Sequence, residues 1–336
     1  MTNGVKPVVT FGEVLLRLSP PGRERLFQSP ALRTYWGGAE ANVAAGLAHL
    51  GTETQHVTVL PHGAIGDAAI SALRAEGIET SRVLRHGDRM GLYFVEPGAD
   101  VRPLRVLYDR ANSAFAQQQG DEFDWNAILR NARWLHLTGI SAAVGDGPLR
   151  SVHAAIDAAA ALDVPVSLDL NFRPALWIGR DPRPIMQALA TRASLLIGNP
   201  GAIDVMLGVR TAGIAPESAE AIRTTIAALH DQYGAARIAI TQREVFSSNR
   251  HAWQAYLWEA STNELYHGGK HTVDVVDRAG GGDAFAAGLL HALIDGVPAR
   301  DAMRFATAAG ALKLTISGDM NRVGVVDVEA IVARLV

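Results

Sequence analysis

Short β-rich runs alternate with longer Ala- and Leu-rich stretches along most of this chain. The short runs are typical of strands, and the longer ones, apolar on one face and often ended by glycine, are typical of helices. Strands are predicted at 8–12, 55–60, 134–138, 166–170, 194–197 and 237–241. Helices are predicted at 40–50, 67–76, 147–162, 283–294 and 299–315.

This alternation predicts an α/β fold with a mostly parallel sheet that helices cover on both faces. No linker, composition shift or repeat of fixed period divides the chain, so we expect one domain over residues 1–336. Ligands of such sheets bind at the carboxyl ends of the strands. Three polar clusters are expected at that edge, namely residues 169–173, Asn199 and residues 241–243.

One segment departs from the alternation of strands and helices. Between Gly91 and Phe115, β-forming and polar residues alternate around a turn at 97–100. This pattern predicts a hairpin with one face in water. The stretch at 15–19 is expected to pair with it. We therefore predict a small β-lid built from about 13–37 and 90–115.

Composition limits the possible functions. The chain of 336 residues has a net charge of −3, which gives no electrostatic footprint for nucleic acid or an anionic membrane. It contains no cysteine, which excludes disulfides, thiolate zinc sites and cysteine nucleophiles. The first seven residues hold no signal-peptide core, and no apolar run reaches the roughly 18 residues that span a bilayer. We therefore expect a cytoplasmic protein with no nucleic-acid or membrane partner.

The most informative stretch is residues 279–283, Ala-Gly-Gly-Gly-Asp, which leads directly into an apolar helix. Consecutive glycines let the backbone approach a ligand closely, and the start of a helix offers free N–H groups and a positive dipole end. Together they predict an anion cradle. A carboxylate placed there is repelled by a bound phosphate, so we interpret Asp283 as a base that takes a proton from an attacking hydroxyl. The alternative is a tight turn whose Asp only caps the helix.

A second glycine pair, Gly37 and Gly38, precedes the helix at 40–50, and Asn42 lies on the first turns of that helix. One interpretation is a helix start after a turn. The other is a small polar ligand that rests on the glycines and forms hydrogen bonds with Asn42. The sequence has no Gly-x-x-x-x-Gly-Lys-Ser/Thr and no Gly-x-Gly-x-x-Gly after the first strand, so neither a P-loop enzyme nor a dinucleotide-binding protein is indicated.

These two stretches together resemble the two signatures of the PfkB (ribokinase-like) carbohydrate kinases. Residues 37–44 resemble the family's Gly-Gly-x-x-x-Asn element, and residues 277–288 resemble its Asp-Thr-x-Gly-Ala-Gly-Asp-x-Phe-x-x-Gly element. The likeness covers nearly the whole chain and implies a ribokinase-like three-layer α/β/α domain with a small β-lid. Within the family, residues 91–93, 106–110 and 166–177 resemble 2-keto-3-deoxygluconate kinases.

The resemblance implies a set of site residues. For catalysis it implies Asp283 as the general base, together with the anion-hole residues Gly280, Gly281 and Gly282, and Arg173. For the sugar it implies contacts from Gly37, Gly38, Asn42, Tyr93, Tyr108, Arg110, Arg173 and Asp283. For ATP it implies contacts from Asn199, Thr241, Arg243, Gly280, Gly282, Ser317 and Gly318.

Physical chemistry gives a reason for the arginines. A sugar acid carries a carboxylate, which the planar guanidinium group holds through two parallel hydrogen bonds. The lid segment contains Arg102, Arg105 and Arg110. Any one of them taken alone is better explained as a solvated charge on an exposed strand. Arg110 follows directly after Tyr108 and Asp109, so we interpret it as a substrate contact.

Two positions depart from the family pattern. Many members carry Asn-x-x-Glu, which is linked to Mg²⁺ and phosphate handling, whereas this chain has Ala202 in place of the Glu. The metal ligands are therefore open, and water with ATP, Glu244 or Asp169 are the alternatives. Arg278 stands where the family usually has a small hydroxyl residue, beside the place of a monovalent cation such as K⁺.

The activity that the resemblance implies is transfer of phosphate from ATP, with Mg²⁺, to the terminal 6-hydroxyl of 2-keto-3-deoxygluconate. Such transfer needs positioning and charge neutralisation, which the glycine turn and Arg173 would supply. The resemblance also implies a homodimer formed through the β-lid. Two alternatives stay open: a PfkB kinase of a neutral sugar or nucleoside, and a sugar- or nucleotide-binding protein with decayed catalysis.

Overall fold

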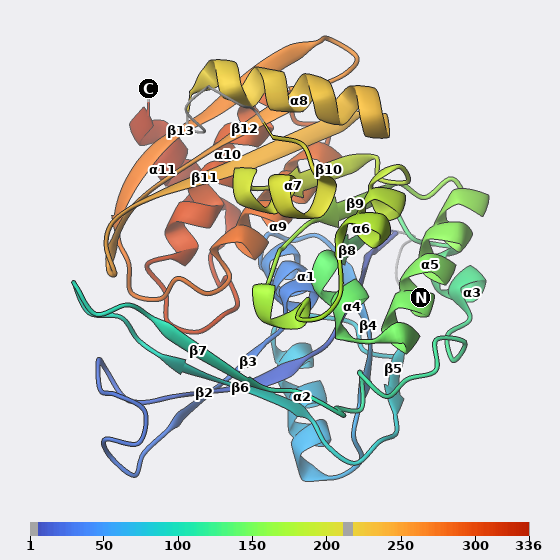
Figure 1. The fold of residues 1–336 in the computed structure, drawn as a ribbon, viewed down its shortest axis with the longest axis vertical. Helices are drawn as coiled ribbons and strands as arrows, with labels where there is room; N and C mark the ends of the chain where they lie inside the picture. Colours follow the sequence, from blue (N-terminus) through green and yellow to red (C-terminus); the bar gives the residue numbers. More distant parts are fainter. Residues whose placement is uncertain (1–5, 211–217, 336) are drawn as a thin grey trace.

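A nine-stranded sheet forms the centre of the computed structural model, which describes residues 6–210 and 218–335 (Figure 1). The strand order is β13-β12-β11-β10-β9-β8-β1-β4-β5. Neighbouring strands from β11 to β5 are parallel, whereas β12 and β13 are antiparallel to their neighbours. The strands are β1 (Val8–Phe11), β4 (Thr54–Leu60), β5 (Val83–Arg85), β8 (Trp134–Thr138), β9 (Val166–Asp169), β10 (Leu195–Gly198), β11 (Arg237–Ser247), β12 (Arg250–Glu259) and β13 (Glu264–Asp274).

The helices follow the strands along the chain, as the alternating pattern predicts. They are α1 (Ala39–His49), α2 (Ala64–Ala75), α3 (Trp125–Leu129), α4 (Gly139–Val144), α5 (Asp146–Ala161), α6 (Arg183–Ala190), α7 (Pro200–Leu207), α8 (Ala219–Tyr233), α9 (Gly281–Ile294), α10 (Ala299–Lys313) and α11 (Val325–Val332). Two short 3₁₀ helices, η1 and η2, lie at Pro174–Leu176 and Ala333–Leu335.

Two hydrophobic clusters cover the opposite faces of the sheet. In β1, Val9 and Phe11 belong to one cluster and Val8 to the other, because successive side chains of a strand point to opposite faces. The first cluster includes residues of α3 to α8, and the second includes residues of α1, α9 and α10. The result is the three-layer α/β/α arrangement that the sequence predicts.

A separate four-stranded sheet forms the lid, in the order β3-β2-β6-β7 (Figure 1). Its strands are β2 (Leu15–Ser19), β3 (Arg33–Gly37), β6 (Gly91–Glu96) and β7 (Arg105–Asp109). Because β2 pairs with β6, the predicted pairing of residues 15–19 with the hairpin is confirmed. The tip of the lid contacts the turn after β11, where the Ser248 hydroxyl donates to the Arg102 carbonyl at 2.6 Å. This hydrogen bond ties the tip of the lid to the turn between β11 and β12 of the central sheet.

All of the strands and helices predicted from the sequence are present, with small shifts in their bounds. The helix predicted from residue 67 begins at Ala64, ahead of its only acidic first-turn residue, Asp67. The hairpin of β12 and β13 was not predicted. Its strands carry mixed buried and half-buried positions that follow neither the apolar runs of the parallel strands nor a clean alternation.

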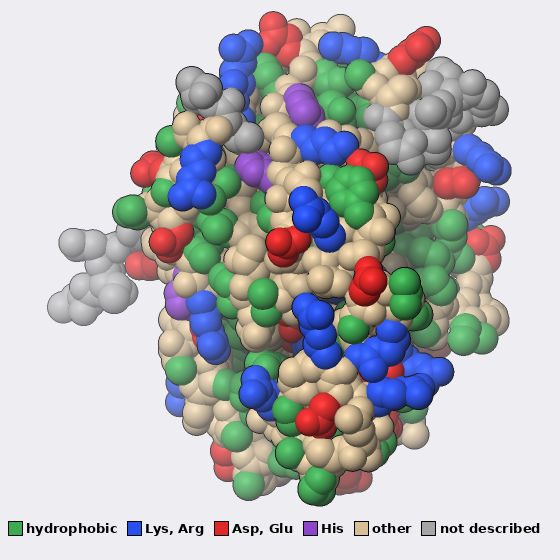
Figure 2. All heavy atoms as spheres, turned by 90° about the vertical axis from the view of Figure 1, so that its left-hand side faces the viewer, with side chains coloured by type: hydrophobic (Ala, Val, Ile, Leu, Met, Phe, Trp, Pro, Cys, Tyr) green, Lys and Arg blue, Asp and Glu red, His purple; other side chains and the backbone are tan. Residues whose placement is uncertain are grey.

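Basic and acidic side chains are interspersed over the face of the molecule that Figure 2 shows, in keeping with the small net charge of −3. Within residues 6–210 and 218–335, no helix combines the length and apolar character that crossing a membrane would require.

Candidate active site

A cavity of about 1150 Å³ opens between the lid and the carboxyl ends of the central strands. Residues of β6 and β7 line it on the lid side, and residues that follow β9 and β10 or belong to β11 line it on the other side. The first turn of α9 also borders it. Pockets for single small ligands typically measure about 300–1,000 Å³, so this one has room for two substrates side by side.

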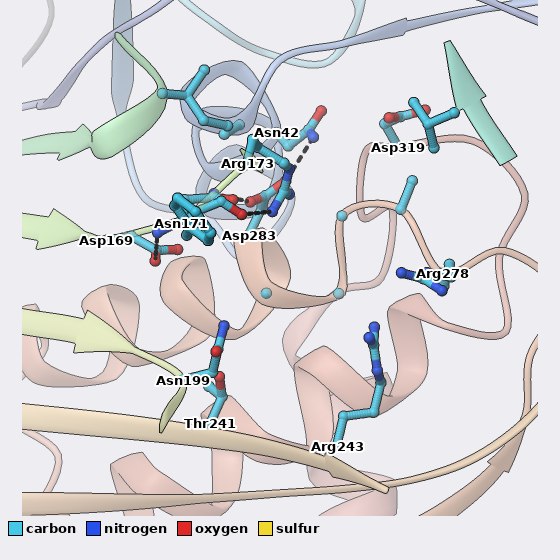
Figure 3. Close-up of a pocket in the computed structure, with 18 of the residues that line it drawn as sticks. Asn42, Asp169, Asn171, Arg173, Asn199, Thr241, Arg243, Arg278, Asp283 and Asp319 are labelled. Carbon is cyan, nitrogen blue, oxygen red and sulfur yellow. Dashed lines mark hydrogen bonds between the residues drawn. The ribbon is translucent and has the colours of Figure 1, made fainter. Parts of the chain in front are cut away.

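Asp283 lies in the first turn of α9 and is buried at the cavity wall. The side-chain amide of Asn42 donates to its Oδ2 at 2.7 Å, and that of Asn171 donates to its Oδ1 at 3.4 Å (Figure 3). Burial raises the pKa of the Asp283 carboxyl to about 6, against the hydrogen bond from Asn42 and the charge of Arg173, which lower it. The arrangement gives an oriented carboxylate that can accept a proton near neutral pH.

The glycine turn leaves its backbone N–H groups open to the cavity. Gly280 has φ 79°, and a Cβ there would lie 1.9 Å from the Asp319 carbonyl oxygen, so only glycine fits. At Gly282 no atom lies within 4 Å of the place where a Cβ would stand. The first N–H groups of α9 have no acceptor within the helix. They therefore form the anion cradle that the sequence predicts, with Asp283 at its edge.

Three arginines border the cavity without an acidic partner. Within the described part of the chain, no carboxylate lies within 4.0 Å of the guanidinium groups of Arg173, Arg243 or Arg278. Figure 3 shows Arg173 close to Asp283, and Arg243 and Arg278 together across the glycine turn. Desolvation and the charges of the other two arginines lower the pKa of Arg243 to about 10. Three clustered cations of this kind suit a highly charged anion such as a nucleotide phosphate chain.

The lid brings Tyr93, Tyr108 and Arg110 to the cavity, as the resemblance implies. Arg110, however, is buried and its Nε donates to Glu13 Oε2 at 2.8 Å in an ion pair. Arg110 thus borders the cavity with its charge already neutralised by Glu13. Tyr93 donates its hydroxyl to Asp319, and its ring stacks on Tyr108 at 6.0 Å.

Three residues predicted at the site do not line the cavity, although Gly38 does. A Cβ at Gly37 would lie 2.8 Å from the Tyr93 hydroxyl, so this glycine makes room for the lid tyrosine. Ser317 and Gly318 lie in the turn behind the cradle, where the Gly318 N–H donates to Asp277 Oδ2 at 3.1 Å. In both turns a sequence neighbour, Gly38 or Asp319, lines the cavity instead.

Further polar residues lie at the cavity wall or behind it. Asn171 holds Asp283, and Asp169 lines the cavity with its pKa raised to about 7 by burial and by the charge of Asp283. Glu40 is fully buried and accepts hydrogen bonds of 2.7 Å from the hydroxyls of Thr138 and Ser141. The sequence predicted the cluster at 169–173 for this edge of the sheet, but not the hydrogen bond from Asn171 to Asp283. The buried hydrogen bonds of Glu40 were not predicted either, because their partners are distant in sequence.

The positions considered for metal binding offer few ligands. Asn199 and Thr241 line the cavity, but the side-chain Oδ1 of Asn199 accepts from the Ala202 N–H at 3.0 Å as the N-cap of α7. Ala202 is buried in the main hydrophobic cluster. Glu244 pairs with Lys270 at 2.8 Å. Over the part of the chain that the structure describes, no group of three or more acidic or His side chains could hold a metal ion.

Known proteins are similar to this chain in sequence and in fold. The profile described as pfkB family carbohydrate kinase matches residues 5–323. This chain matches the crystal structure of a 2-dehydro-3-deoxygluconokinase from Thermotoga maritima with a TM-score of 0.94. The two sequences are 36% identical, and the match covers 98% of each chain. A 2-dehydro-3-deoxygalactonokinase from Haloferax volcanii is 30% identical over 96% of each chain. A 2-dehydro-3-deoxygluconokinase from Bacillus subtilis is 27% identical over 93% of this chain and 91% of its own.

The α/β/α layers, the β-lid and the glycine cradle with its carboxylate define a ribokinase-like phosphotransferase that acts on an alcohol group. The chain belongs to the pfkB family of carbohydrate kinases, which confirms the resemblance seen in its sequence.

Proposed function

We propose that this kinase transfers the γ-phosphoryl group of ATP to the terminal 6-hydroxyl of 2-keto-3-deoxygluconate, also called 2-dehydro-3-deoxygluconate. The observation that carries the proposal is the oriented, buried carboxylate of Asp283 at the glycine cradle, with the unpaired Arg173 beside it. The similarity to 2-dehydro-3-deoxygluconokinases over nearly the full chain supports the substrate class.

In this reaction the 6-hydroxyl gives its proton to an Asp283 carboxylate oxygen as its own oxygen forms a bond to the γ-phosphorus. The bond between that phosphorus and the bridging oxygen breaks, and its electron pair leaves with ADP. Asn42 and Asn171 keep the Asp283 carboxylate aimed at the cavity. The N–H groups of the first turn of α9 stabilise the charge on the equatorial oxygens of the transferred group.

The nucleotide is proposed to lie along β11, where Arg243 and Arg278 meet its phosphates. When Mg²⁺ is bound, it neutralises part of the negative charge on the phosphate oxygens. Because the described residues offer no cluster of three acids, we propose that ATP and water hold the ion, with Asp169 at the cavity wall as the candidate protein ligand. We also propose that the enzyme acts in the cytoplasm, where ATP is available, and cell fractionation would test this.

The substrate carboxylate is assigned to Arg173 rather than to Arg110. Arg110 already pairs with Glu13, whereas Arg173 donates only to the neighbouring carbonyl of Phe172 at 3.2 Å. A free guanidinium at the cavity edge can form the bidentate bond that a sugar acid offers. Neutral sugars gain nothing from such a group, so the free arginine favours an acid substrate over the fructose, ribose or nucleoside alternatives.

Replacing this arginine, Arg173→Gln, is expected to raise KM for 2-keto-3-deoxygluconate by roughly 10–100-fold, the equivalent of a charged hydrogen bond of about 1.5–3 kcal/mol. Turnover of any neutral sugar should change much less. ADP release over a panel of 2-keto-3-deoxygluconate, its galactonate epimer, fructose, ribose and a nucleoside measures both effects. Arg105→Gln on the exposed strand β7 is the matched control. An unchanged KM for the acid would refute the assignment, and no turnover with any compound would favour the decayed-kinase alternative.

We also propose a homodimer formed through the lid. Strands β3 and β7 are the open edges of the lid sheet, and Phe27 and Leu107 are 70% and 49% exposed. Open edges and exposed apolar side chains are features that a partner normally covers. Light scattering should give about twice the 35.7 kDa of one chain, and a mass near 35.7 kDa would reject the dimer.

A further inference from the structure

Lys313 is a fully buried lysine at the end of α10, directly behind the glycine cradle. Its ammonium donates to the Ile316 carbonyl at 3.0 Å and to the Asp277 carbonyl at 3.5 Å. Its stem packs on the turn, because a Cβ at Gly280 would lie 3.2 Å from Lys313 Cε. A buried ammonium group is costly unless its surroundings compensate its charge. This lysine therefore marks a place where the structure demands a cation.

Two buried carboxylates near Lys313 explain why a positive charge is needed there. Asp277 and Asp319 are buried close by, and both carboxylates pair with the single guanidinium of Arg17, at 2.8 and 2.9 Å. Two negative charges and one positive charge leave a deficit of one positive charge. The ammonium of Lys313 makes this cluster neutral. Burial lowers the pKa of Lys313, and the two carboxylates oppose that shift.

The carbonyl oxygens around this ammonium come from the two turns that shape the cradle. Asp277 begins the turn that contains Gly280, and Ile316 belongs to the turn that leads to Asp319. Backbone carbonyl oxygens in a ring are the ligands that replace the water of a K⁺ ion in proteins. In this chain Lys313 already takes those oxygens, so the residues present do not fit the monovalent cation that the family resemblance implies at this turn.

We infer that Lys313 is a tethered cation that takes the place of a monovalent metal ion behind the anion cradle. It acts as a positioning residue, which fixes the Asp277–Gly280 turn through the Asp277 carbonyl and adds positive potential beneath the phosphate site. The kinase is therefore active without K⁺. This inference rests on the proposed kinase reaction and goes beyond it, because cation requirement is independent of which sugar is phosphorylated.

The test compares Lys313→Ala with Lys313→Met in buffers of equal ionic strength made with tetramethylammonium, Na⁺, K⁺ or NH₄⁺. The alanine leaves room for an ion, whereas methionine fills the space without a charge. We expect wild-type kcat/KM to vary by less than about twofold between these salts, because buffers of equal ionic strength screen charges equally. Lys313→Ala should lose about 100-fold in tetramethylammonium, as for loss of one anion-hole contributor, and regain at least about tenfold with K⁺ or NH₄⁺. Lys313→Met should lose as much and respond to neither ion.

Calorimetric titration with ADP in the same salts gives a second measure that needs no sugar substrate. ADP affinity should depend on K⁺ or NH₄⁺ only in Lys313→Ala. If wild type phosphorylates no sugar, the proposed function fails while this binding test still decides the role of Lys313. Wild type that needs K⁺ for activity or binding overturns the inference, as does Lys313→Ala that equals wild type in tetramethylammonium. Should both variants fail to fold by circular dichroism, the wild-type salt series alone decides.

Discussion

Asparagine in place of Asp283 is expected to lower kcat by about 10²- to 10⁴-fold, the usual contribution of a general base. The amide has the size of the carboxylate, but it cannot take the hydroxyl proton. Fold and nucleotide affinity should persist, because α9 and the cradle N–H groups are unchanged. ADP release with 2-keto-3-deoxygluconate measures the loss, and calorimetry with an unreactive ATP analogue checks binding.

Asp301→Asn is the matched control, since Asp301 lies in the first turn of α10 and faces solvent. This variant should turn over at the wild-type rate. Near-normal turnover of Asp283→Asn would instead place the base elsewhere, with the buried Asp169 as the first candidate.

The pH profile of the wild type gives an independent check of the same base. Burial raises the pKa of Asp283 from 3.8 to about 6, and the base works only when ionised. The value of kcat/KM should therefore rise with pH up to about 6 and level off above it, falling tenfold for each pH unit below. A profile that stays flat down to about pH 4.5 would contradict the assignment, because an Asp283 with that pKa is then mostly protonated.

Replacing Arg17 with methionine is expected to lower the free energy of unfolding by about 3–5 kcal/mol, because it leaves two buried carboxylates without their partner. Arg17 is buried on β2 of the lid and pairs with Asp277 and Asp319, which belong to the turns around the cradle. Denaturant unfolding followed by circular dichroism measures the change. Adding Asp319→Asn to the variant should recover part of the loss, since one orphaned charge is removed.

Arg25→Met serves as the control for that experiment. Arg25 is also a lid arginine, but its side chain is 67% exposed and its nearest acid, Glu96, lies 3.7 Å away. Exposed pairs contribute about 0–1 kcal/mol, so this variant should unfold close to wild type. A loss for Arg17→Met no larger than that of Arg25→Met would mean that water or local rearrangement compensates the two carboxylates.

The sequence was sufficient for the layered fold, because strands and helices with buried faces leave periodic patterns in it. It also located the glycine turn and Asp283 at the cavity wall, since the glycine run before Asp283 is a local signal. The hairpin of β12 and β13 lacked such a pattern, as its strands are only partly buried.

Pairings between distant residues could not be predicted in the same way. The partner of Arg110 is Glu13, 97 positions away, and nothing in either neighbourhood marks that pair. Lys313 is the last residue of an Ala-rich helix, a position where a lysine is normally exposed to solvent and interacts with the helix dipole. Only the folded chain shows that its ammonium is buried under the cradle.

The ion pairs of Arg17 with Asp277 and Asp319 limit how the lid can be engineered. A lid taken from a relative and grafted onto this chain would bring new sugar contacts, yet it would also remove the counter-charge of Asp277 and Asp319. The graft would be tolerated only if it carried an arginine at the place of Arg17. The lid therefore cannot be exchanged independently of the rest of the chain. An experiment that changes substrate specificity by lid exchange should transfer the two turns together with the lid.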